Sequence, residues 1–456
     1  MARHFSPYPR FIPLLGLVLS LFGLSAGAAT FTVTNLNDSG PGSLRQVILD
    51  ANATADDDTI AFQSGLSGTI TLTTGEITIS SNLTINGPGA NVLAVSGNKN
   101  TRIFTISPGA SVTIERLTLK DGATSGGDGG GGIYNAGGIL TVSNSTLAGN
   151  SAGGGGGGIY NFGGTVTITN CTISNNSEGS PQSGFGGGGI ANNGGTLTVS
   201  NSTLSNNSTL SSYGGGIFNV NDGMLTVINS TLANNSAQDN YTATGGGIAN
   251  VNRGKATVIN STLAGNSATA SGGIGNDSFS TLTVINSTLA GNSAQTDGGG
   301  IGRGVFGYTP PSLGNTVVTN NTAPTGAQCS EPVLDNGHNL DSGTTCGFDV
   351  NKGSLNNTDP LLGPLADNGG PTLTMTLLPG SPAINAGDNA LIPIDVTTDQ
   401  RGFPRIQDGM VDIGAVEISS TTDIPTLSQW ALLLGGLLLG GIAWRTLIGR
   451  TTALRR

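Results

Sequence analysis

Short runs of alternating apolar and polar residues recur along the middle of the chain at a regular interval. Each run follows a glycine-rich stretch that ends in an isoleucine, and these residues are Ile133, Ile159, Ile190, Ile217, Ile248, Ile274 and Ile301. The six steps cover 168 residues, so the mean repeat is 28 residues long. Periods of roughly 20 to 50 residues indicate a solenoid or a propeller.

An asparagine recurs in phase with these isoleucines, at Asn144, Asn170, Asn201, Asn229, Asn260, Asn286 and Asn315. Apolar side chains lie two and four residues before it and three after it, as Val142, Leu140 and Leu147 do in the first copy. Such alternation predicts strands whose apolar side chains face inward. Each repeat therefore holds three short strands, whereas a propeller blade needs four strands in about 40 residues.

The pattern predicts an all-β, right-handed parallel β-helix in which each repeat forms one triangular coil. Coils stacked about 4.8 Å apart would share backbone hydrogen bonds on both sides. We expect the asparagine column to form an amide ladder at a bend. Regular coils are expected over residues 123–323, between irregular coils at 29–122 and final coils with a cap at 324–420.

An amphipathic helix is predicted near the start of the first segment. Ser43 and Gln46 form a capping box, and one face of the following turns is apolar, with Leu44, Val47, Ile48 and Ala51. The helix would form an N-terminal cap that covers the open end of the coil stack, which otherwise exposes a sheet edge.

One column departs from the outward polar pattern. The residue before the repeated asparagine is Ser or Thr in the first three coils and isoleucine in the next three, at Ile228, Ile259 and Ile285. An apolar strip on a sheet facing water predicts a partner. The chain 324–418 folding back, a second molecule, or a local turn of these residues into the core would each account for it.

Charge is scarce throughout the chain. Only 10% of the residues are charged, against roughly 25% in ordinary domains. The 27 acidic and 17 basic residues leave a net charge of −10, which argues against nucleic acid because that partner requires clustered Lys and Arg.

Both ends of the chain carry targeting patterns. Residues 1–28 combine Arg3 and Arg10, a short apolar stretch and small residues at Ala26 and Ala28, which predicts a secretory signal peptide. Residues 421–456 contain a short motif, an apolar run from Trp430 to Trp444 and several arginines. That run predicts a transmembrane helix with a cytoplasmic tail.

The C-terminal motif resembles the IPTL-type sorting signal of Gram-negative bacteria through Ile424, Pro425, Thr426, Leu427, Ser428 and Trp430. Ala431 stands where that family has glycine. The resemblance implies a transient stay in the inner membrane and cleavage by an exosortase-like transpeptidase, so that the protein reaches the envelope, the surface or the medium. A plain tail anchor is the alternative.

Other segments resemble exported bacterial proteins. The repeat, with its GGGI and NSTL stretches, is similar to polymorphic outer-membrane-protein repeats, and FTVTNLNDSGPGSLRQVILDAN resembles the N-terminal CSLREAI motif without its cysteine. Residues 324–420 resemble the choice-of-anchor Q region. These resemblances imply a surface-displayed, adhesin-like or structural β-helix. The alternative is a carbohydrate-active enzyme, a polysaccharide lyase or glycosidase, with a site in the cap or the first coils.

The regular coils offer little chemistry. Catalytic carboxylates of a β-helix glycosidase would lie at matching places on adjacent coils, and no such pair occurs, so we assign no catalytic, cofactor or metal residues. Asp222 is expected to pair with Arg253 or Lys255 at the surface. The region after residue 385 is richer, and a metal or sugar site competes there with buried ion pairing among Asp388, Asp395, Asp399, Arg401, Arg405, Asp408, Asp412 and Glu417.

The three cysteines divide into a pair and a single residue. Cys329 and Cys346 lie in one short irregular segment of a chain bound for an oxidising compartment, so we expect a disulfide. Cys171 replaces a serine of the repeat and is expected to be a free, buried filler.

Insertions fall on one edge of the predicted stack. The distance from isoleucine to asparagine is 11 or 12 residues in six coils, whereas the distance from asparagine to the next isoleucine varies from 14 to 20. Such an edge is typical of solenoid binding faces. We expect it to bind a glycan or a surface ligand of a host or neighbouring cell through Glu178, Phe185, Tyr213, Asp239, Tyr241 and Asp297.

Overall fold

The computed structural model describes Met1 and residues 27–54, 56–179, 186–210, 213–239, 243–277, 279–303 and 309–418. Nearly all of the predicted signal peptide, the whole sorting motif and the predicted transmembrane helix lie outside these residues. Within the described ranges, no helix is both long enough and apolar enough to cross a membrane.

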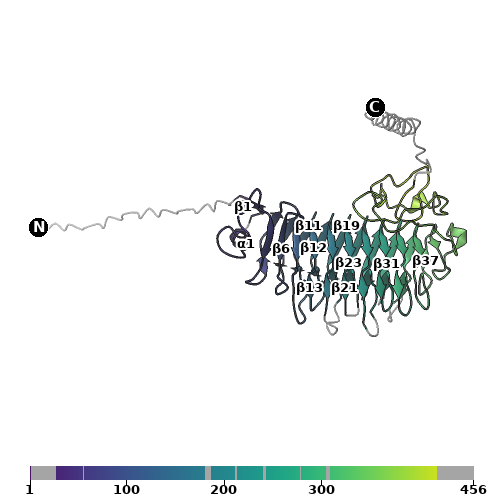
Figure 1. Cartoon of the computed structure of the whole chain (residues 1–456), viewed down its shortest axis with the longest axis horizontal. Helices are drawn as coiled ribbons and strands as arrows, with labels where there is room; N and C mark the ends of the chain where they lie inside the picture. The colour runs from purple at the N-terminus through teal and green to yellow at the C-terminus, as the bar shows by residue number, and fades with distance from the viewer. Residues whose placement is uncertain are drawn as a thin grey trace, which may run out of the picture.

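The described chain forms a right-handed parallel β-solenoid, and its strands follow one another along a single axis (Figure 1). Sheet A has twelve strands: β1 (Thr30–Val33), β2 (Asp58–Phe62), β5 (Leu83–Asn86), β8 (Ser111–Glu115), β11 (Ile139–Ser143), β15 (Thr165–Thr169), β19 (Thr196–Ser200), β23 (Met224–Ile228), β27 (Lys255–Ile259), β31 (Thr281–Ile285), β35 (Ser312–Gly314) and β37 (Leu334–Asp335). Sheet B has eleven: β3 (Gly68–Thr71), β6 (Leu93–Ser96), β9 (Thr118–Lys120), β12 (Thr146–Ala148), β16 (Thr172–Ser174), β20 (Thr203–Ser205), β24 (Thr231–Ala233), β28 (Thr262–Ala264), β32 (Thr288–Ala290), β36 (Val317–Thr319) and β38 (Leu340–Asp341).

Two further sheets complete the coils. Sheet C has nine strands: β4 (Ile77–Ile79), β7 (Phe104–Ile106), β10 (Ile133–Asn135), β14 (Ile159–Phe162), β18 (Ile190–Asn193), β22 (Ile217–Val220), β26 (Ile248–Asn250), β30 (Ile274–Asn276) and β34 (Ile301–Arg303). Sheet D has six: β13 (Ser151–Ala152), β17 (Ser177–Glu178), β21 (Ser208–Thr209), β25 (Ser236–Ala237), β29 (Ser267–Ala268) and β33 (Ser293–Ala294). The prediction of three strands per coil was therefore incomplete, because strands of two residues are too short to show alternation.

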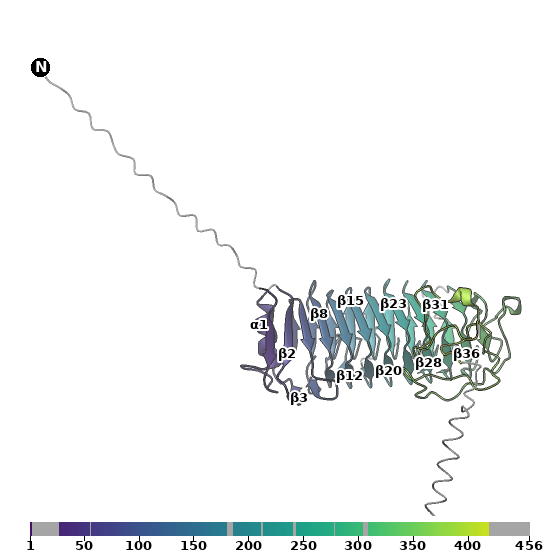
Figure 2. The ribbon, with the colours of Figure 1, turned by 90° about the horizontal axis from the view of Figure 1, so that it is seen from above.

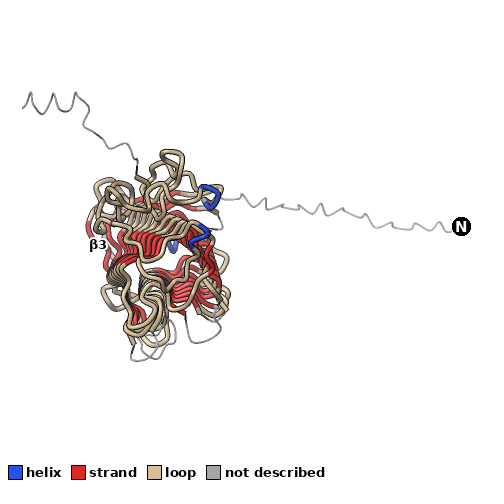
Figure 3. Tube along the Cα trace, turned by 90° about the vertical axis from the view of Figure 1, so that its right-hand side faces the viewer, coloured by secondary structure: helices blue, strands red, loops and turns tan. Residues whose placement is uncertain are grey.

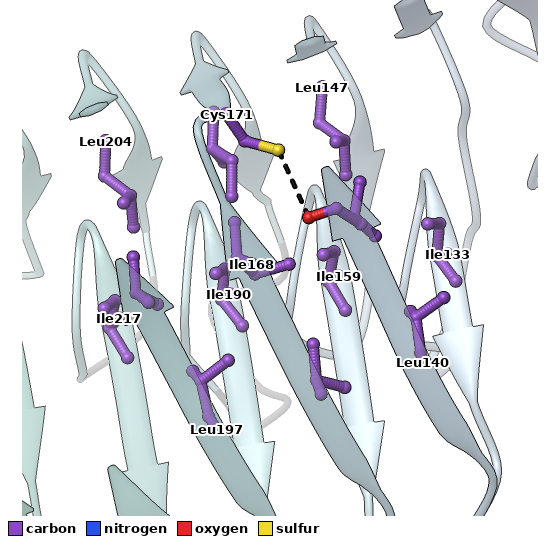
Figure 4. Packing of buried hydrophobic residues seen from close by; sticks show 14 of the residues in the cluster. Ile133, Leu140, Leu147, Ile159, Ile168, Cys171, Ile190, Leu197, Leu204 and Ile217 are labelled. Carbon is purple, nitrogen blue, oxygen red and sulfur yellow. Dashed lines mark hydrogen bonds between the residues drawn. The ribbon is translucent and has the colours of Figure 1, made fainter. Parts of the chain in front are cut away.

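The core follows the register of the repeat. Ile133 pairs with Ile159, and Leu140 pairs with Val166 on the neighbouring strand of sheet A. Ile133, Leu140 and Leu147 have no exposed surface, and equivalent side chains of successive coils stack along the axis (Figure 4). The inward positions predicted from alternation are thus the core positions.

The predicted asparagine column forms an amide ladder only in part. These asparagines mark a bend, where Asn144 and Asn170 adopt φ values of 49° and 53°, and their side chains are bonded only in separate pairs, such as Asn170 to Asn144 and Asn260 to Asn229. Continuous buried ladders come from two other columns. One contains Asn135, Asn161, Asn192, Asn219, Asn250 and Asn276, and the other contains Asn150, Asn176, Asn207, Asn235, Asn266, Asn292 and Asn321.

The predicted helix is α1 (Leu44–Asn52), at the N-terminal end of the stack (Figure 2). Ser43 accepts a hydrogen bond from the Gln46 backbone N, and the four predicted apolar residues are buried. The Gln46 side chain donates to Asp50 instead of returning to Ser43, so only half of the capping box forms. That α1 acts as a cap stays a prediction.

The C-terminal segment, residues 324–418, first continues the stack through β37 and β38, and its later residues fold back over earlier coils. It contains the short 3-10 helices η1 (Val350–Lys352) and η2 (Asn389–Leu391). Its loops, yellow-green in Figure 1, lie along one side of the stack, whose strands superpose when the stack is viewed along its length (Figure 3). Thr372 Oγ1 donates to the Asn229 carbonyl over 3.4 Å, and Asn260 Nδ2 donates to the Thr398 carbonyl over 2.6 Å.

The contact of the C-terminal segment with the coils explains why some outward-facing threonines of sheet B are buried. Thr146, Thr172 and Thr203 of sheet B remain at least partly exposed, whereas the equivalent Thr231, Thr262 and Thr288 are buried. Ile228, Ile259 and Ile285 are half-buried and directly precede the asparagine column that the C-terminal segment touches. That the segment covers the isoleucine strip stays a prediction, because Ser143, Thr169 and Ser200 of the uncovered coils are half-buried as well.

Candidate functional site

The acidic cluster of the C-terminal segment is an inward-facing ionic network. Asp399, Asp412, Glu417 and Arg405 are all at most 1% exposed. Arg401 Nη2 lies 2.8 Å from Asp399 Oδ2, and Arg405 Nη1 lies 3.2 Å from Glu417 Oε1. The alternative of buried Asp–Arg pairing thus describes this region.

Burial governs the electrostatics of this network. Burial raises the pKa of Glu417 to about 8, although the Arg405 guanidinium opposes the shift. Burial also raises the pKa of Asp412, against hydrogen bonds from the backbone N of Asn385 and of Ile418. No three His, Cys, Asp or Glu side chains in the described ranges are grouped so that they could hold a metal ion.

The two predicted cysteine classes are both present. Cys329 and Cys346 form a disulfide with Cα atoms 4.8 Å apart. Cys171 is buried and free, and its Sγ donates to the Val142 and Thr169 carbonyls; Figure 4 draws one hydrogen bond of this thiol. Burial raises the pKa of this thiol to about 11, so it fills the serine position without becoming reactive at neutral pH.

The edge formed by the turns of variable length exposes only some of the residues that were predicted to bind a ligand there. Glu178 is 1% exposed and accepts a hydrogen bond from Thr209 Oγ1 at 2.8 Å, so its assignment to an exposed binding edge was wrong. It occupies the inward position of β17, where β13 has Ala152. A strand of two residues is too short to show apolar–polar alternation, so the sequence could not reveal that the Glu178 side chain points inward.

The remaining members of the edge lie on separate turns. Tyr213 is half-buried and stacks on Phe218 with ring centroids 5.3 Å apart. Asp239 accepts a hydrogen bond from the Ala243 backbone N, and the backbone of Asp297 bridges to Thr325. Two members, Phe185 and Tyr241, lie outside the described residues.

The surface ion pair predicted in the regular coils is present. Arg253 donates to both carboxylate oxygens of Asp222, over 3.0 and 2.8 Å, and both side chains are about 60% exposed. Such exposed pairs contribute little to stability.

A polar hollow of about 410 Å³ opens on the first coils, where the sequence offered no motif. It is lined by Glu76, Lys99, Asn100, Thr101, Arg102, Ala123, Thr124, Ser125 and Asp128. The Arg102 guanidinium pairs with Glu76 and donates to the Gly130 and Gly129 carbonyls over 3.0 and 2.9 Å. Two acidic and two basic side chains therefore balance one another here.

An aromatic row continues from this hollow along sheet C. Arg102 lies 5.2 Å above the Tyr134 ring centroid, and Tyr134 stacks on Tyr160 at 5.6 Å. Asn193 Nδ2 donates to the Tyr160 hydroxyl over 2.9 Å, and Phe162 is 52% exposed beside it. Hydroxyl, amide and aromatic groups in this arrangement are of the kind that contact a sugar chain, and within the hollow Glu76 is paired with Arg102.

Sequence reasoning missed the hollow because its lining comes from irregular turns between short strands. It also missed the two buried asparagine columns, although a signal was present. In IYN, IYN, IAN, IFN, IAN and IGN the asparagine stands two residues after the inward isoleucine, and that parity places it inside.

Comparisons with known proteins give matches of two kinds. Residues 424–456 match the family model of the IPTL-CTERM motif. The crystal structure of pectate lyase Pel9A is similar with a TM-score of 0.52 and 15% sequence identity, covering 86% of this chain and 97% of that chain. No curated protein matches this chain.

These matches define what is established. At 15% identity the likeness to the lyase shows the parallel β-helix fold alone. The C-terminal sorting signal implies export to the cell envelope or surface and a sorting system that acts on the chain.

Proposed function

We propose that the protein is a non-catalytic, surface-displayed β-helix that serves as an adhesin or structural element. The sorting motif at residues 424–456 carries this proposal, because such a signal places the chain at the envelope. The ionisable side chains after residue 385 that are buried pair with one another and so provide no accessible catalytic group. The α1 helix would act as the N-terminal cap of the stack.

The ligand would bind along the loop edge. Tyr213, Asp239 and Asp297 are the described members that remain at least partly accessible, and Phe185 and Tyr241 are assigned to the same edge from the sequence. The variable lengths of these turns would let the edge diversify while the coils keep their register. A glycan or a cell-surface ligand fits this arrangement.

The sorting step has its own test. Intact-mass analysis of the protein taken from its native envelope should show that residues 445–456 are missing, because an exosortase-like enzyme would cut before the basic tail. A mass that retains Arg445 to Arg456 would leave the plain tail anchor.

The second candidate is a carbohydrate-active enzyme. The hollow lined by Glu76, Lys99 and Asp128 favours it, because an open polar depression on a β-helix surface can hold a sugar chain. A glycan array and a depolymerisation screen on native protein separate the two candidates. Binding without turnover supports the first proposal, whereas release of reducing or unsaturated ends would overturn it.

A further inference from the structure

The last described residues, Glu417 and Ile418, are held in place by backbone hydrogen bonds to the C-terminal segment. Glu417 N donates to Asp399 Oδ2 over 2.9 Å, and Ile418 N donates to Asp412 Oδ2 over 2.6 Å. Both carboxylates belong to the buried ionic network. The point from which the chain continues toward its sorting signal is therefore held by the folded domain.

The distance from this point to the membrane is limited by chain length. The apolar run starts at Trp430, twelve residues after Ile418, and twelve residues reach at most about 40 Å. The twelve strands of sheet A, at about 4.8 Å each, extend over roughly 50 Å. While the C-terminal run is in the membrane, the C-terminal segment is thus the part of the domain that is brought to the lipid.

Exposed apolar side chains gather beside the same point. Ile394 is 96% exposed, Phe403 and Ile406 are each 48% exposed, and Met410 is 42% exposed. We call these four residues the exit patch. Ile394 and Ile406 line a hollow of about 370 Å³ whose walls also include Ile392, Val396 and Pro404.

Printed contacts tie the exit patch to the chain end. Arg405 lines the hollow, and its guanidinium lies 3.2 Å from Glu417. The Arg401 guanidinium donates to the Glu417 carbonyl and lies 4.7 Å from the Phe403 ring centroid. Phe403 and the hollow that Ile394 and Ile406 line are therefore each linked through one arginine to Glu417, at the start of the tether, the chain that continues from Ile418 to the apolar run.

We propose that the exit patch rests on the lipid surface while the C-terminal run is still in the membrane. This proposal rests on the proposed sorting function. Single exposed apolar residues are ordinary, but a cluster around an apolar hollow indicates a partner. We expect the partner to be lipid, because the chain between Ile418 and the apolar run keeps the patch close to the bilayer, at a high effective concentration.

Charge refines the expected chemistry. Asp395 and Asp408 are exposed next to the patch, so an anionic surface would repel them. Contact should therefore depend on the apolar side chains and the tether, and be at least as strong on zwitterionic lipid as on anionic lipid. This differs from recruitment by a basic patch, which requires anionic lipid.

Site-specific fluorescence on the full, uncleaved chain tests the proposal. Ile394→Cys or Met410→Cys is labelled with an environment-sensitive dye, and the protein is reconstituted in phosphatidylcholine vesicles containing nitroxide-labelled lipid. Ile139→Cys is the matched control, because Ile139 is 54% exposed on β11, far along the stack. Cys171 is buried and should not take the dye.

We expect a blue-shifted emission and at least threefold stronger nitroxide quenching at positions 394 and 410 than at 139. Equal quenching at all three positions would overturn the proposal. A blue shift that persists in detergent without nitroxide quenching would identify the chain's own motif as the occupant and overturn it. A blue shift of the dye emission that instead grows with protein concentration would identify a second copy of the chain as the occupant, and this result would also overturn the proposal. The vesicles contain no sorting enzyme, so failure here is distinct from failure of C-terminal cleavage in the mass analysis.

Discussion

Asn207 shows how one buried side chain links three coils. Its Nδ2 donates to Asn235 Oδ1 and to the Ile173 carbonyl, each over 2.9 Å, while its Oδ1 accepts from Nδ2 of Asn176 at 2.9 Å. Each asparagine in this ladder satisfies the amide of the preceding one. Burial of polar groups is favourable here because every donor and acceptor has a partner.

Replacing Asn207 with alanine should lower the free energy of unfolding by about 2–5 kcal/mol, because several buried polar groups lose their partners together. The exposed neighbour Asn206 has a φ of 55°, and Asn206→Gly is the matched control because earlier and later coils use Gly149 and Gly265 at this place. Chemical denaturation measures both. Equal losses in the two variants would contradict a special role of the ladder.

Asp38 is the corresponding charged residue at the N-terminal end. It accepts hydrogen bonds from the Arg45 guanidinium at 2.8 Å and from the backbone N of Thr73 and Thr74 at 2.9 and 2.8 Å. Partial burial raises the pKa of Asp38, but these hydrogen bonds outweigh burial and hold the pKa well below its usual range. The carboxylate thus fastens α1 to the turn after β3.

The pKa of Asp38 predicts the sign of a pH effect. A depressed pKa contributes stability that is present above the unfolded-state value, near pH 4, and is lost as the pH falls toward the folded-state value. Asp38→Asn should cost about 1–3 kcal/mol at pH 7, and the difference from wild type should shrink between pH 4 and pH 2. Denaturant titrations at several pH values measure it, with the exposed Asp50→Asn on α1 as control. A constant difference across this range would argue against the ionised pair.

At the scale of elements, the C-terminal segment is held to the coils through Gln400. Its Nε2 donates to Thr231 Oγ1 over 2.8 Å, and its Oε1 accepts from Thr262 Oγ1 at 2.6 Å. Both threonines belong to sheet B, whose earlier equivalents face solvent. One amide thus bridges two coils and the segment that covers them.

Gln400→Leu should release the segment before the coils unfold, since it leaves buried hydroxyl groups without partners and costs about 2–4 kcal/mol. Limited proteolysis should then cut the chain between residues 355 and 418 faster than in the wild type. The half-buried Gln407 of the same segment supplies the control variant Gln407→Leu. Unchanged cleavage in Gln400→Leu would mean that other contacts hold the segment.

The alternation of inward and outward side chains along each strand determined which buried positions could be predicted from the sequence. Leu140 and Val142 alternate with threonine, so their inward direction was readable. Asn135 has the same inward parity as Ile133, but the sequence analysis assigned it no place, because only partners on adjacent coils make burial of an amide favourable. Glu178 and the polar hollow depend on turns of irregular length, which no period describes.

At the scale of the whole molecule, the described strands of each regular coil pair only with those of the adjacent coils, and the C-terminal segment adds contacts to some of them. Deleting residues 144–169 removes one complete repeat, since Asn144 and Asn170 are 26 residues apart. Ile133 would then pair with Ile190, and Asn135 with Asn192. We expect a folded β-helix with a modestly lower melting temperature, because stability in such arrays is nearly a sum over repeats.

Circular dichroism and thermal denaturation compare this variant with a deletion of residues 144–156, which removes about half a coil. The half-coil deletion breaks the register of every sheet it interrupts and should fail to fold. If both deletions behaved alike, nearest-neighbour stacking would not be the source of stability.

The asparagine ladders also bear on how such a protein changes over generations. The upper surface of one coil accepts the lower surface of any other, because the same amide contact closes the joint at Asn176 and at Asn266. Unequal recombination within the gene can therefore add or remove a coil without any new complementary residue. Each event would lengthen or shorten the β-helix by about 4.8 Å, so the length of the stack can vary through copy number while the C-terminal point where the chain leaves the fold stays unaltered.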